Sequence, residues 1–451
     1  MRSTRDRIAS IVVDLGYGDS GKGGVTDYLC GVGEDSLVIR FNGGSQAAHG
    51  VTEPGGRRHV FAQFGSGMLR PGVRTLLSKH MLVSPLAMLS EERCLRENGV
   101  KDAFHRTDIS EDALIISPFQ RAANRLREIA RGGSRHGSCG HGVGETASDA
   151  LRHPDEALRA AHLSASDLPR RLRRIQERKR AEAADAIAAC RNLKRSHAEI
   201  ACLEDASVPE RWVERLGAFL ADARIRSEDD VHALVRAHGH LVFEGAQGVL
   251  LDEWRGFHPY TTWSTCTFDN ALSLLDGYGW DGDIIKIGVI RGYATRHGAG
   301  PFPTGNAMMT RLLPDADNVM NDWQKGFRVG WLDLVAIRYA IAACGGIDAL
   351  AVTCLDRLKP IRTWDVCDAY ETPTGTIRDL SLGPRQDLAH QESLTSLLAS
   401  AKPKYRMTTD REDFDHKAIE HALAVNSLLG EPAEGLLIST GPTRADKTVI
   451  F

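Results

Sequence analysis

A glycine-rich segment near the N-terminus has the composition of a phosphate-binding loop. It runs from Gly16 to Gly24 with the sequence GYGDSGKGG, between an apolar run and a stretch at 25–30 that we expect to be helical. The backbone N–H groups of such a turn and the positive end of the following helix favour phosphate. The spacing of Gly16, Gly21 and Lys22 fits the start of a P-loop. Gly23, however, stands where that motif has the Ser or Thr that binds magnesium.

One acidic residue, Asp19, lies inside this loop. A carboxylate there would repel phosphate unless a cation bridges the two or the carboxylate acts as a base. Asp19 is therefore a candidate magnesium ligand and general base. The alternative is an aspartate that only stabilises the turn through bonds from its side chain to the backbone.

A second run of small residues follows the apolar stretch at 37–41. It extends from Asn42 to Gly50 and contains a single histidine, His49. Loops at the carboxyl ends of parallel strands form the ligand sites of α/β sheets. A lone histidine is more often structural, but its place on a glycine-rich loop next to another such loop predicts a functional role for His49.

The elements that must position these loops are short apolar runs separated by helical patterns. The runs are rich in Ile, Val and Leu and do not alternate with polar residues, which is typical of strands buried on both faces of a parallel sheet. One helical pattern begins at Asp333, an acid expected in the first turn. The alternation predicts an α/β fold with a large, mostly parallel central sheet and right-handed crossovers. The runs are 11–15, 37–41, 113–117, 241–244, 284–290, 349–355 and 435–440.

Residues 147–238 differ in being rich in Ala, Arg, Glu and Asp, and we expect them to be helical throughout. No internal repeat or low-complexity linker divides the chain, so we expect one domain, 1–451, with a helical lobe at about 147–238. The stretch 169–180 is strongly basic. We interpret it as a solvated helix face. A cationic rim that steers phosphates is the second interpretation, and nucleic-acid binding is the third because no aromatic residues accompany the charge.

Composition excludes several classes of protein. With 56 Lys and Arg against 59 Asp and Glu, the net charge of -3 argues against a dedicated nucleic-acid binder. No apolar run approaches 18 residues, and Asp14 interrupts the apolar stretch near the N-terminus, so we expect neither a membrane span nor a signal peptide. The nine cysteines include no C-x-x-C pair. That pattern signals no zinc or redox site and favours a cytoplasmic protein with reduced thiols.

Seven segments of the chain resemble, in order, the motifs of the adenylosuccinate synthetases. The two glycine-rich loops resemble the first two motifs, and similar segments continue to residue 442. Such an ordered series is hard to obtain by chance, so the chain is identified as a member of that family. Only the helical segment at about 147–238 lacks clear matches. The other five segments are 243–252 with 259–262, 295–304, 330–333, 353–356 and 439–442.

The resemblance implies a homodimeric ligase that condenses L-aspartate with a 6-oxopurine nucleotide, using a nucleoside triphosphate and Mg²⁺. Family members transfer the γ-phosphoryl group to purine O6, and the aspartate amine then displaces phosphate. Asp19 would remove the proton from purine N1, while His49 and Lys22 would stabilise the transferring phosphoryl group. Gln247 would complete the catalytic set. Magnesium would be held by Asp19 and by the backbone at Ala48.

The resemblance also assigns residues to three binding sites. The monophosphate substrate would contact Ser20, Ser138, Cys139, Thr262, His297 and Gly298, and Arg152 would reach it from a neighbouring subunit. Aspartate would contact Lys325 and Arg328. The triphosphate would contact Gly18, Gly21, Gly23, Asp356, Ser439 and Gly441.

The sequence departs from the family pattern at several contact positions. Ser20 replaces the glutamate beside the base. Because purine C2 is bonded to N1, this smaller residue would leave room for the 2-amino group of guanine. Cys354 replaces a lysine beside the donor base, which makes ATP or dATP a donor candidate besides GTP. Gly24 replaces a lysine, the pair at 138–139 replaces two threonines, and the aspartate loop keeps only two cations.

The changes at Ser20 and Cys354 resemble the phage-type branch of the family, the N6-succino-2-amino-2′-deoxyadenylate synthases, which act on dGMP. We therefore favour dGMP as substrate, with an ordinary enzyme acting on IMP with GTP as the alternative. A non-catalytic nucleotide-binding regulatory protein on the same fold is the rival from another class, but the presence of Asp19 and His49 argues against it. A P-loop phosphatase or GTPase is disfavoured by Gly23 and by the purine-site segments.

Overall fold

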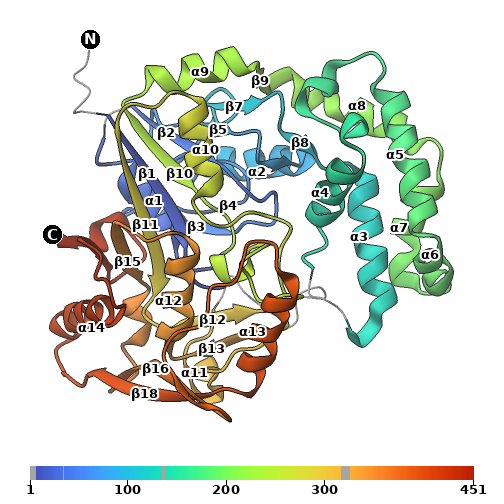
Figure 1. The fold of residues 1–451 in the computed structure, drawn as a ribbon. Helices are drawn as coiled ribbons and strands as arrows, with labels where there is room; N and C mark the ends of the chain where they lie inside the picture. The colour runs from blue at the N-terminus through green and yellow to red at the C-terminus, as the bar shows by residue number, and fades with distance from the viewer. Residues whose placement is uncertain (1–6, 34, 135–137, 316–325, 451) are drawn as a thin grey trace.

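The computed structural model describes residues 7–33, 35–134, 138–315 and 326–450. Its centre is a ten-stranded sheet (Figure 1) in the order β20-β19-β15-β11-β1-β10-β2-β5-β7-β9, in which every neighbouring pair is parallel except β19 and β20. The predicted α/β fold with a large, mostly parallel sheet is confirmed. The strands are β1 Ile8–Asp14, β2 Ser36–Arg40, β5 Arg74–Leu77, β7 Thr107–Ser110, β9 Arg224–Arg226, β10 His240–Glu244, β11 Asp283–Arg291, β15 Ala349–Thr353, β19 Gly435–Ser439 and β20 Lys447–Ile450.

Both faces of the central strands are buried, which explains their uninterrupted apolar runs. On β1, Ile11 and Val13 contribute to the larger core, which also contains side chains from α9 Glu228–Ala237, α10 Asp269–Gly277 and α12 Leu334–Ala343. Val12 contributes to a separate cluster on the other face, together with Val25 of α1 Lys22–Leu29. Side chains along a strand alternate between faces, so β1 is held between two helical layers. The loop that follows β1 therefore leaves a rigid base.

Six of the seven apolar runs form strands of this sheet, and the run at 113–117 does not. It contains only the short strand β8 Leu114–Ile115, which pairs with β6 Leu82–Val83 outside the central sheet. The sheet takes β7 instead, whose mixed sequence TDIS carries a weaker apolar signal. The helix expected at 25–30 begins earlier, at Lys22. Asp333 caps α12 from just outside it and accepts a hydrogen bond from the Ala336 backbone N at 3.2 Å, so it does not lie in the first turn.

A mainly helical lobe extends from the sheet (Figure 1, right). The expectation that 147–238 is helical throughout is wrong at β9, which forms the last strand of the sheet, where Arg224 and Arg226 pair with Asp108 of β7 at 3.2 and 2.7 Å. One core includes side chains of the lobe and of α2 Pro85–Glu97. The one-domain organisation stays a prediction. The helices of the lobe are α3 Pro118–Arg131, α4 Val143–Arg152, α5 Leu168–Glu182, α6 Ala184–Cys190, α7 His197–Glu204 and α8 Val208–Asp222.

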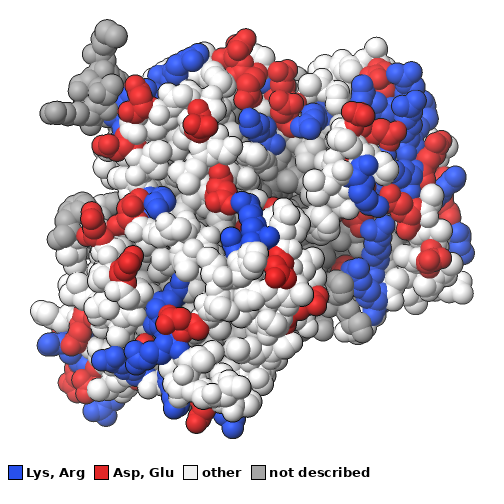
Figure 2. Space-filling model, in the orientation of Figure 1, with Lys and Arg blue, Asp and Glu red and all other residues white. Residues whose placement is uncertain are grey.

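The basic stretch at 169–180 forms most of α5, and its charges are extensively paired. Arg173 pairs with Glu210 and Arg178 with Glu156, and Figure 2 shows Lys and Arg gathered with Asp and Glu over this side of the molecule. Lys179 is an exception to the interpretation of a solvated helix face. It is fully buried and pairs with Asp149 and Glu182, both at 2.5 Å. The pairing supports the interpretation of a helix face neutralised by its neighbours rather than a free cationic surface.

Several smaller strand pairings accompany the central sheet. A small sheet joins β14, β16, β17 and β18, and two hairpin-like pairs, β12 with β13 and β3 with β4, lie beside the central sheet. No helix in the described part of the chain is long and apolar enough to cross a membrane. The bounds are β3 His49–Thr52, β4 Arg58–Phe61, β12 Ala294–His297, β13 Phe327–Gly330, β14 Leu332–Asp333, β16 Trp364–Thr372, β17 Gly375–Ile377, β18 Lys402–Thr409, α11 Ala307–Leu312, α13 Leu388–Ser400 and α14 Phe414–Leu428.

Candidate functional site

The first glycine-rich loop is held by the last residue of β1, Asp14. Its buried carboxylate accepts hydrogen bonds from the backbone N of Gly16 at 2.8 Å and of Ser20 at 2.9 Å, and it pairs with the Lys22 ammonium at 2.9 Å. Gly18 and Gly21 have positive φ of 93° and 83°, which favours glycine. Asp14 therefore fixes both the path of the loop and the position of Lys22.

Asp19 lies at the tip of this loop with a left-handed φ of 62°. Such a backbone is costly for a residue other than glycine and is concentrated at functional sites. Its half-buried side chain lines a cavity of about 460 Å³. Burial raises the pKa of Asp19, while the charges of Arg291 and Lys22 act in the opposite direction. A raised pKa makes the carboxylate a better proton acceptor, so the geometry suits the expected base.

His49 begins β3 and faces the same cavity. Its Nδ1 lies 2.6 Å from Oε1 of the fully buried Glu244, at the end of β10. A Cβ on Gly23 would lie 2.9 Å from the Cβ of His49. Helix α1 thus packs directly against the histidine, and a larger residue at 23 could not be accommodated without a shift. This explains why the loop lacks the hydroxyl residue of a P-loop at that position.

The 460 Å³ cavity brings together the segments expected to bind the triphosphate, and we call it the donor cavity. Its lining includes the first loop, Asp356 on the turn after β15, and the segment after β19. The Ser439 hydroxyl donates to the backbone O of Gly441 at 3.0 Å, which shapes that last segment. Burial raises the pKa of Asp356. Of the triphosphate residues expected from sequence, this cavity is lined by Gly21, Gly23, Asp356, Ser439 and Gly441, whereas Gly18 lines a neighbouring small cavity.

Lys447 is a further cation of the donor cavity that sequence reasoning missed. It begins β20, and its Nζ lies 3.6 Å from the position that a Cβ on Gly24 would occupy. The ammonium donates to the backbone O of Thr443 at 2.8 Å. Burial lowers the pKa of Lys447, and Asp27 and Asp446 oppose that effect. A lysine from the C-terminal strand thus lies over the glycine that replaces the lysine of the family loop.

The donor set around Asp19 fits magnesium. Asp19 and Ala48 line the same cavity, so one carboxylate and backbone carbonyl oxygens are available there. Within the described residues, no group of three or more His, Cys, Asp or Glu side chains forms a metal cage. Magnesium is commonly held by one or two carboxylates together with waters and substrate phosphates. The residues present therefore suit a cation that is completed by a bound triphosphate.

A second cavity, of about 580 Å³, lies between the body and the lobe, and we call it the acceptor cavity. Gln247, with φ of 58°, and Gln46 from the second loop both line it. The amide O and N atoms of both side chains are buried and have no hydrogen-bond partner among the described residues. Buried amides are normally satisfied, so this pair indicates that a ligand supplies their partners. Thr262, His297 and Gly298 line the same cavity.

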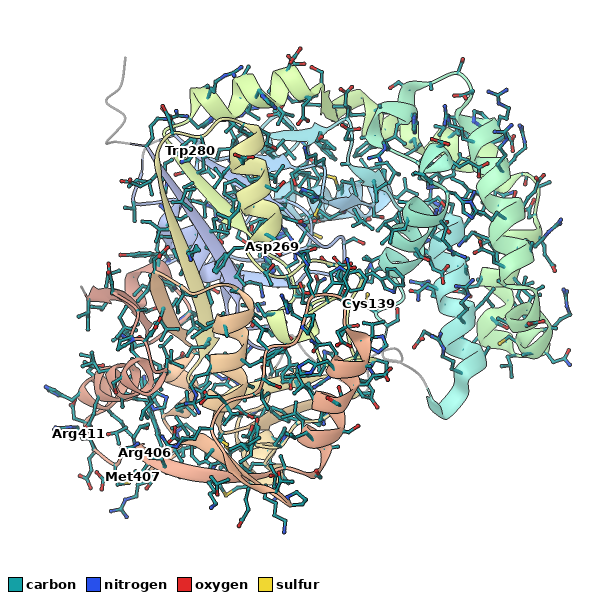
Figure 3. The ribbon with its side chains drawn as sticks, in the orientation of Figure 1. Cys139, Asp269, Trp280, Arg406, Met407 and Arg411 are labelled. Carbon is teal, nitrogen blue, oxygen red and sulfur yellow. The ribbon has the colours of Figure 1, made fainter. Side chains whose placement is uncertain are left out.

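The lobe side of the acceptor cavity is built around α3. Ser138 donates to Oδ1 of Asn124 at 3.0 Å, and both line the cavity with Cys139, which lies where the lobe meets the body (Figure 3). Burial raises the pKa of the Cys139 thiol. Arg127 and Arg131 also line this wall, where they pair with Glu145 and Glu128 of the same lining. Arg152 lies beyond the lining, half-exposed, with Asp149 and Glu182 each 3.6 Å away.

The two residues expected to bind aspartate have different outcomes. Lys325 lies outside the described residues. Arg328 on β13 donates to the backbone O of Gly298 at 2.8 Å and of Gly300 at 3.1 Å. Its guanidinium therefore braces the turn that borders the acceptor cavity. A neighbouring arginine, Arg296, is almost fully buried and donates to the backbone O of Ala299 at 3.0 Å.

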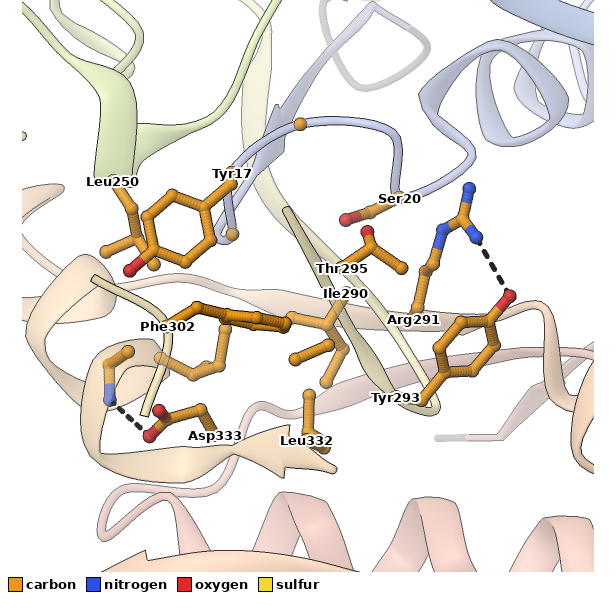
Figure 4. Close-up of a pocket in the computed structure, with 15 residues that line it drawn as sticks. Tyr17, Ser20, Leu250, Ile290, Arg291, Tyr293, Thr295, Phe302, Leu332 and Asp333 are labelled. Atoms are coloured by element: carbon orange, nitrogen blue, oxygen red, sulfur yellow. Dashed lines mark hydrogen bonds between the residues drawn. The ribbon is translucent and has the colours of Figure 1, made fainter. Parts of the chain in front are cut away.

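Ser20 faces a third, small cavity rather than either large one. That cavity has a volume of about 30 Å³, roughly the space of one water, and is lined by Tyr17, Thr295 and Asp333 as well (Figure 4). Burial raises the pKa of Asp333 to about 6. The serine side chain is 5% exposed, and its backbone O accepts a bond from the Thr353 hydroxyl at 2.7 Å. A small space thus exists beside the residue that follows Asp19.

Several functional residues were not found from the sequence. In the sequence, Asp14 is recognisable only as an interruption of an apolar stretch, and Gln46 is one polar residue in a run of small ones. Arg291 is buried and donates through Nε to the backbone O of Asp19. It comes from β11, which is distant in the sequence but pairs with β1 in the sheet. An acid or amide directly at the carboxyl end of a predicted parallel strand was the signal available for Asp14. No local pattern marks Arg291.

The chain resembles known proteins over nearly its whole length. The model of the family described as "Adenylosuccinate synthetase" matches residues 11–448 of this chain. The adenylosuccinate synthetase of Myxococcus xanthus is 29% identical over 446 residues, covering 98% of both chains. That of Mycobacterium leprae is 30% identical over 448 residues, again covering 98% of both.

Two solved structures share the fold. Fully ligated adenylosuccinate synthetase from Plasmodium falciparum superposes with a TM-score of 0.74 at 20% identity, covering 99% of this chain and 100% of that one. Succinoaminodeoxyadenylate synthetase of cyanophage S-2L, bound to dGMP and to dATP as an energy donor, gives 0.57 at 15% identity, covering 98% and 95%. At these identities the likeness concerns the fold alone.

Proposed function

The chain belongs to the adenylosuccinate synthetase family, and from that premise we propose that its preferred acceptor is dGMP. As a family member it is a carbon–nitrogen ligase that joins aspartate to a purine nucleotide. With dGMP the product would be N6-succino-2-amino-2′-deoxyadenylate. The observation that carries the proposal is the small residue Ser20 directly after Asp19, with a cavity of about 30 Å³ beside it.

The chemistry of the ring connects that cavity to the substrate. If the Asp19 carboxylate accepts the proton of purine N1, the neighbouring residue faces the adjacent ring atom, C2. A glutamate at 20 would place a carboxylate and one further methylene there. Serine leaves space and a hydroxyl that accepts a hydrogen bond, which an exocyclic 2-amino group can donate. IMP has only hydrogen at C2 and would leave the space unfilled, at a cost in contact energy.

The residues of the site divide the reaction between them. Asp19 takes the N1 proton, which makes O6 nucleophilic toward the γ-phosphorus. Lys22 and His49 line the donor cavity, where they would stabilise charge on the transferring group. A magnesium ion at Asp19 and Ala48 would supply charge neutralisation between the phosphates. The orphan amides of Gln46 and Gln247 would hold the nucleotide while the aspartate amine displaces phosphate from C6.

The donor site accepts more than one interpretation. Asp356 lines the donor cavity, and its carboxylate would accept the hydrogen bonds that guanine donates, which supports GTP. Cys354, with φ of 55°, lines the same cavity where the family has a lysine, which supports ATP or dATP. Lys447 lines the same cavity, and we propose that it contacts the triphosphate whichever base is bound. A homodimer, with Arg152 contributed to the neighbouring subunit, completes the proposal.

An ordinary adenylosuccinate synthetase, acting on IMP with GTP, is the second candidate. It is favoured by the curated relatives, which bear that name and match 98% of this chain at 29–30% identity. Both candidates use the same residues and differ only in what occupies the space next to Ser20.

A substrate matrix decides between them. IMP, GMP and dGMP are crossed with GTP, ATP and dATP in the presence of aspartate and Mg²⁺, and phosphate release is measured together with the succinylated nucleotide. We expect the highest kcat/KM with dGMP. A higher kcat/KM with IMP would assign the ordinary activity. Phosphate release from triphosphate alone, without nucleotide or aspartate dependence, would contradict both candidates.

A further inference from the structure

A third large cavity lies outside the site described above and is lined by residues of α2 and of the lobe helices α3, α7 and α8. Its volume is about 460 Å³, and we call it the arginine cavity. Residues from the starts of α2 and α3 and from α7 and α8 line it. Three of them are arginines, Arg121, Arg211 and Arg215, and one is an acid, Asp205.

The charges of the arginine cavity are not balanced. Arg211 pairs with Asp205 at 2.8 Å. Within the described residues, the guanidinium groups of Arg121 and Arg215 make no ion pair and no hydrogen bond. Partial desolvation lowers the pKa of Arg121, and the charges of Arg125 and Arg215 act in the same direction, whereas Cys202 and Glu199 act against it. All three arginines are exposed residues, so water screens part of the repulsion between them, and a bound anion would relieve the rest.

Two helix N-termini open on the same cavity and add to its positive potential. Ser84 and Ser117 precede α2 and α3, which have 13 and 14 residues, and each helix starts with a proline that lines the cavity. The N-terminal end of a helix carries partial positive charge and favours phosphate and carboxylate groups. The two helix ends and the three arginines thus line one cavity, although the N-terminus of α3 is also capped by the Ser117 side chain.

The remaining wall of the arginine cavity is apolar. Trp212, which is 6% exposed, lines it with Leu86 and Val208. An apolar wall opposite a cationic rim suits a ligand with a hydrophobic or aromatic body and an anionic group. Inorganic phosphate alone would leave that wall in water. A volume of about 460 Å³ is in the range of cavities that enclose small organic ligands.

We propose that the arginine cavity is a second ligand site, which binds a small organic phosphate through Arg121, Arg211 and Arg215. It is separate from the acceptor cavity because α3 lies between the two. Arg121 faces the arginine cavity, whereas Asn124, Arg127 and Arg131 on other positions of the same helix face the acceptor cavity. The site also differs from the donor cavity, with which it shares no lining residue.

Calorimetric titration of the full chain with ATP, at low ionic strength, tests the proposal by counting sites. A Lys22→Ala background weakens the donor site and leaves the arginine cavity intact, so that the outcome does not depend on the catalytic assignment. We expect the double variant R121A/R215A to weaken the remaining ATP site by about 100-fold, since each charge-assisted contact contributes about tenfold. The matched control is Arg174→Ala, an exposed arginine of α5, which should bind as the parent does.

Two further arms keep the result unambiguous. R121K/R215K retains both charges and should keep most of the affinity, whereas a folding defect would lower it as well. Inorganic triphosphate should bind more weakly than ATP, and equal affinities would overturn the organic part of the proposal. Unchanged ATP binding in R121A/R215A would overturn the site. A smaller mass in sedimentation with unchanged binding would assign the cavity to a contact between protein chains instead.

Discussion

The Nδ1 atom of His49 lies 2.6 Å from Oε1 of Glu244, and both side chains are buried. Burial opposes ionisation of Glu244, but the His49 and Arg40 charges and hydrogen bonds from His49 and Ser66 hold its pKa at about 2. The carboxylate is therefore ionised at neutral pH and accepts the Nδ1 proton. A neutral imidazole carries only that one proton. His49 can then donate from Nε2 to a phosphoryl group only as the imidazolium.

Replacing Glu244 by Gln should lower kcat about tenfold near neutral pH, because a hydrogen bond to a charged group is lost. Burial lowers the pKa of His49 to about 4, and the Glu244 carboxylate acts against that shift. The negative charge of a bound triphosphate would likewise raise the pKa of His49. Without the carboxylate, His49 is protonated only at lower pH, so the limb of the kcat–pH profile that falls as pH rises should move to lower pH.

The matched control for that variant is Glu91→Gln. Glu91 is also buried, accepts hydrogen bonds from the backbone N of Ala62 and Gln63 at 2.8 Å each, and lies 4.0 Å from His59 outside the site. Its replacement should cost stability without moving the pH profile. The same profile for Glu244→Gln and the wild-type chain would remove the histidine–glutamate pair from the phosphoryl-transfer step.

Two aspartates of the first loop should be separable by kinetics. Asp19→Asn should lower kcat by about 10²- to 10⁴-fold, the range for loss of general acid–base catalysis, while triphosphate binding survives. Asp14→Asn should instead weaken triphosphate binding, because Asp14 holds Lys22 and the loop amides. Single-turnover kinetics and binding measurements on both variants give the comparison. Substantial turnover by Asp19→Asn would exclude Asp19 as the base.

The sequence allowed the sheet and both loops to be predicted because their signals are local. Apolar runs mark strands buried on two faces, and glycines with a charged residue between them mark a loop at a strand's end. Strands β5, β7, β9 and β20 of the sheet were not predicted. The sequence of β9, RIR, has no apolar run. Its place in the sheet depends on Asp108, more than a hundred residues away.

The parts of the site that could not be predicted are contacts between distant segments. Lys447 reaches the position over Gly24, and Glu244 reaches His49, only after the parallel strands are assembled. Gln46 gives no signal of its own, and its importance emerges from a buried amide without a partner beside the equally unpartnered Gln247. Asp14 stood at the right place, the end of a predicted strand, but its four acceptor contacts belong to the folded loop.

Ser20→Glu should penalise dGMP more than IMP. The added methylene and carboxylate would fill the small cavity beside Ser20 and meet the 2-amino group, whereas the C2 hydrogen of IMP demands less room. We expect kcat/KM for dGMP to fall by about tenfold or more relative to that for IMP, the scale of a steric change of a few atoms in a pocket. Ser20→Ala keeps the space but removes the hydroxyl, so it should lower the dGMP preference only by the worth of one neutral hydrogen bond, a smaller change than that of Ser20→Glu. Equal losses for both nucleotides would contradict the proposed acceptor.

Lys447→Met should raise the KM for the triphosphate about tenfold with little change in kcat, since a charge-assisted contact is removed from the donor cavity while the reacting groups stay in place. Lys404→Met, at an exposed position of β18, removes the same charge elsewhere. The two variants should therefore differ in their KM for the triphosphate, whereas their thermal stabilities should be similar. A triphosphate KM that is the same in both would show that Lys447 has no part in donor binding.

The buried histidine of α14 should make the fold sensitive to acid. His421 is fully buried, and its Nδ1 lies 2.7 Å from the Thr408 hydroxyl. Burial lowers its pKa to about 4 from a usual value near 6.5. Between pH 6.5 and 4 the unfolded chain binds a proton that the folded chain does not, so the free energy of unfolding falls as pH decreases, by about 1.4 kcal/mol per pH unit for this group. In His421→Phe that contribution is absent. Urea unfolding at a series of pH values should show that the free energy of unfolding of the variant, relative to that of the wild-type chain, rises as pH falls from about 6.5 to about 4. Thr408→Val keeps the histidine and should keep the wild-type slope, and parallel curves for His421→Phe and wild type would contradict the argument.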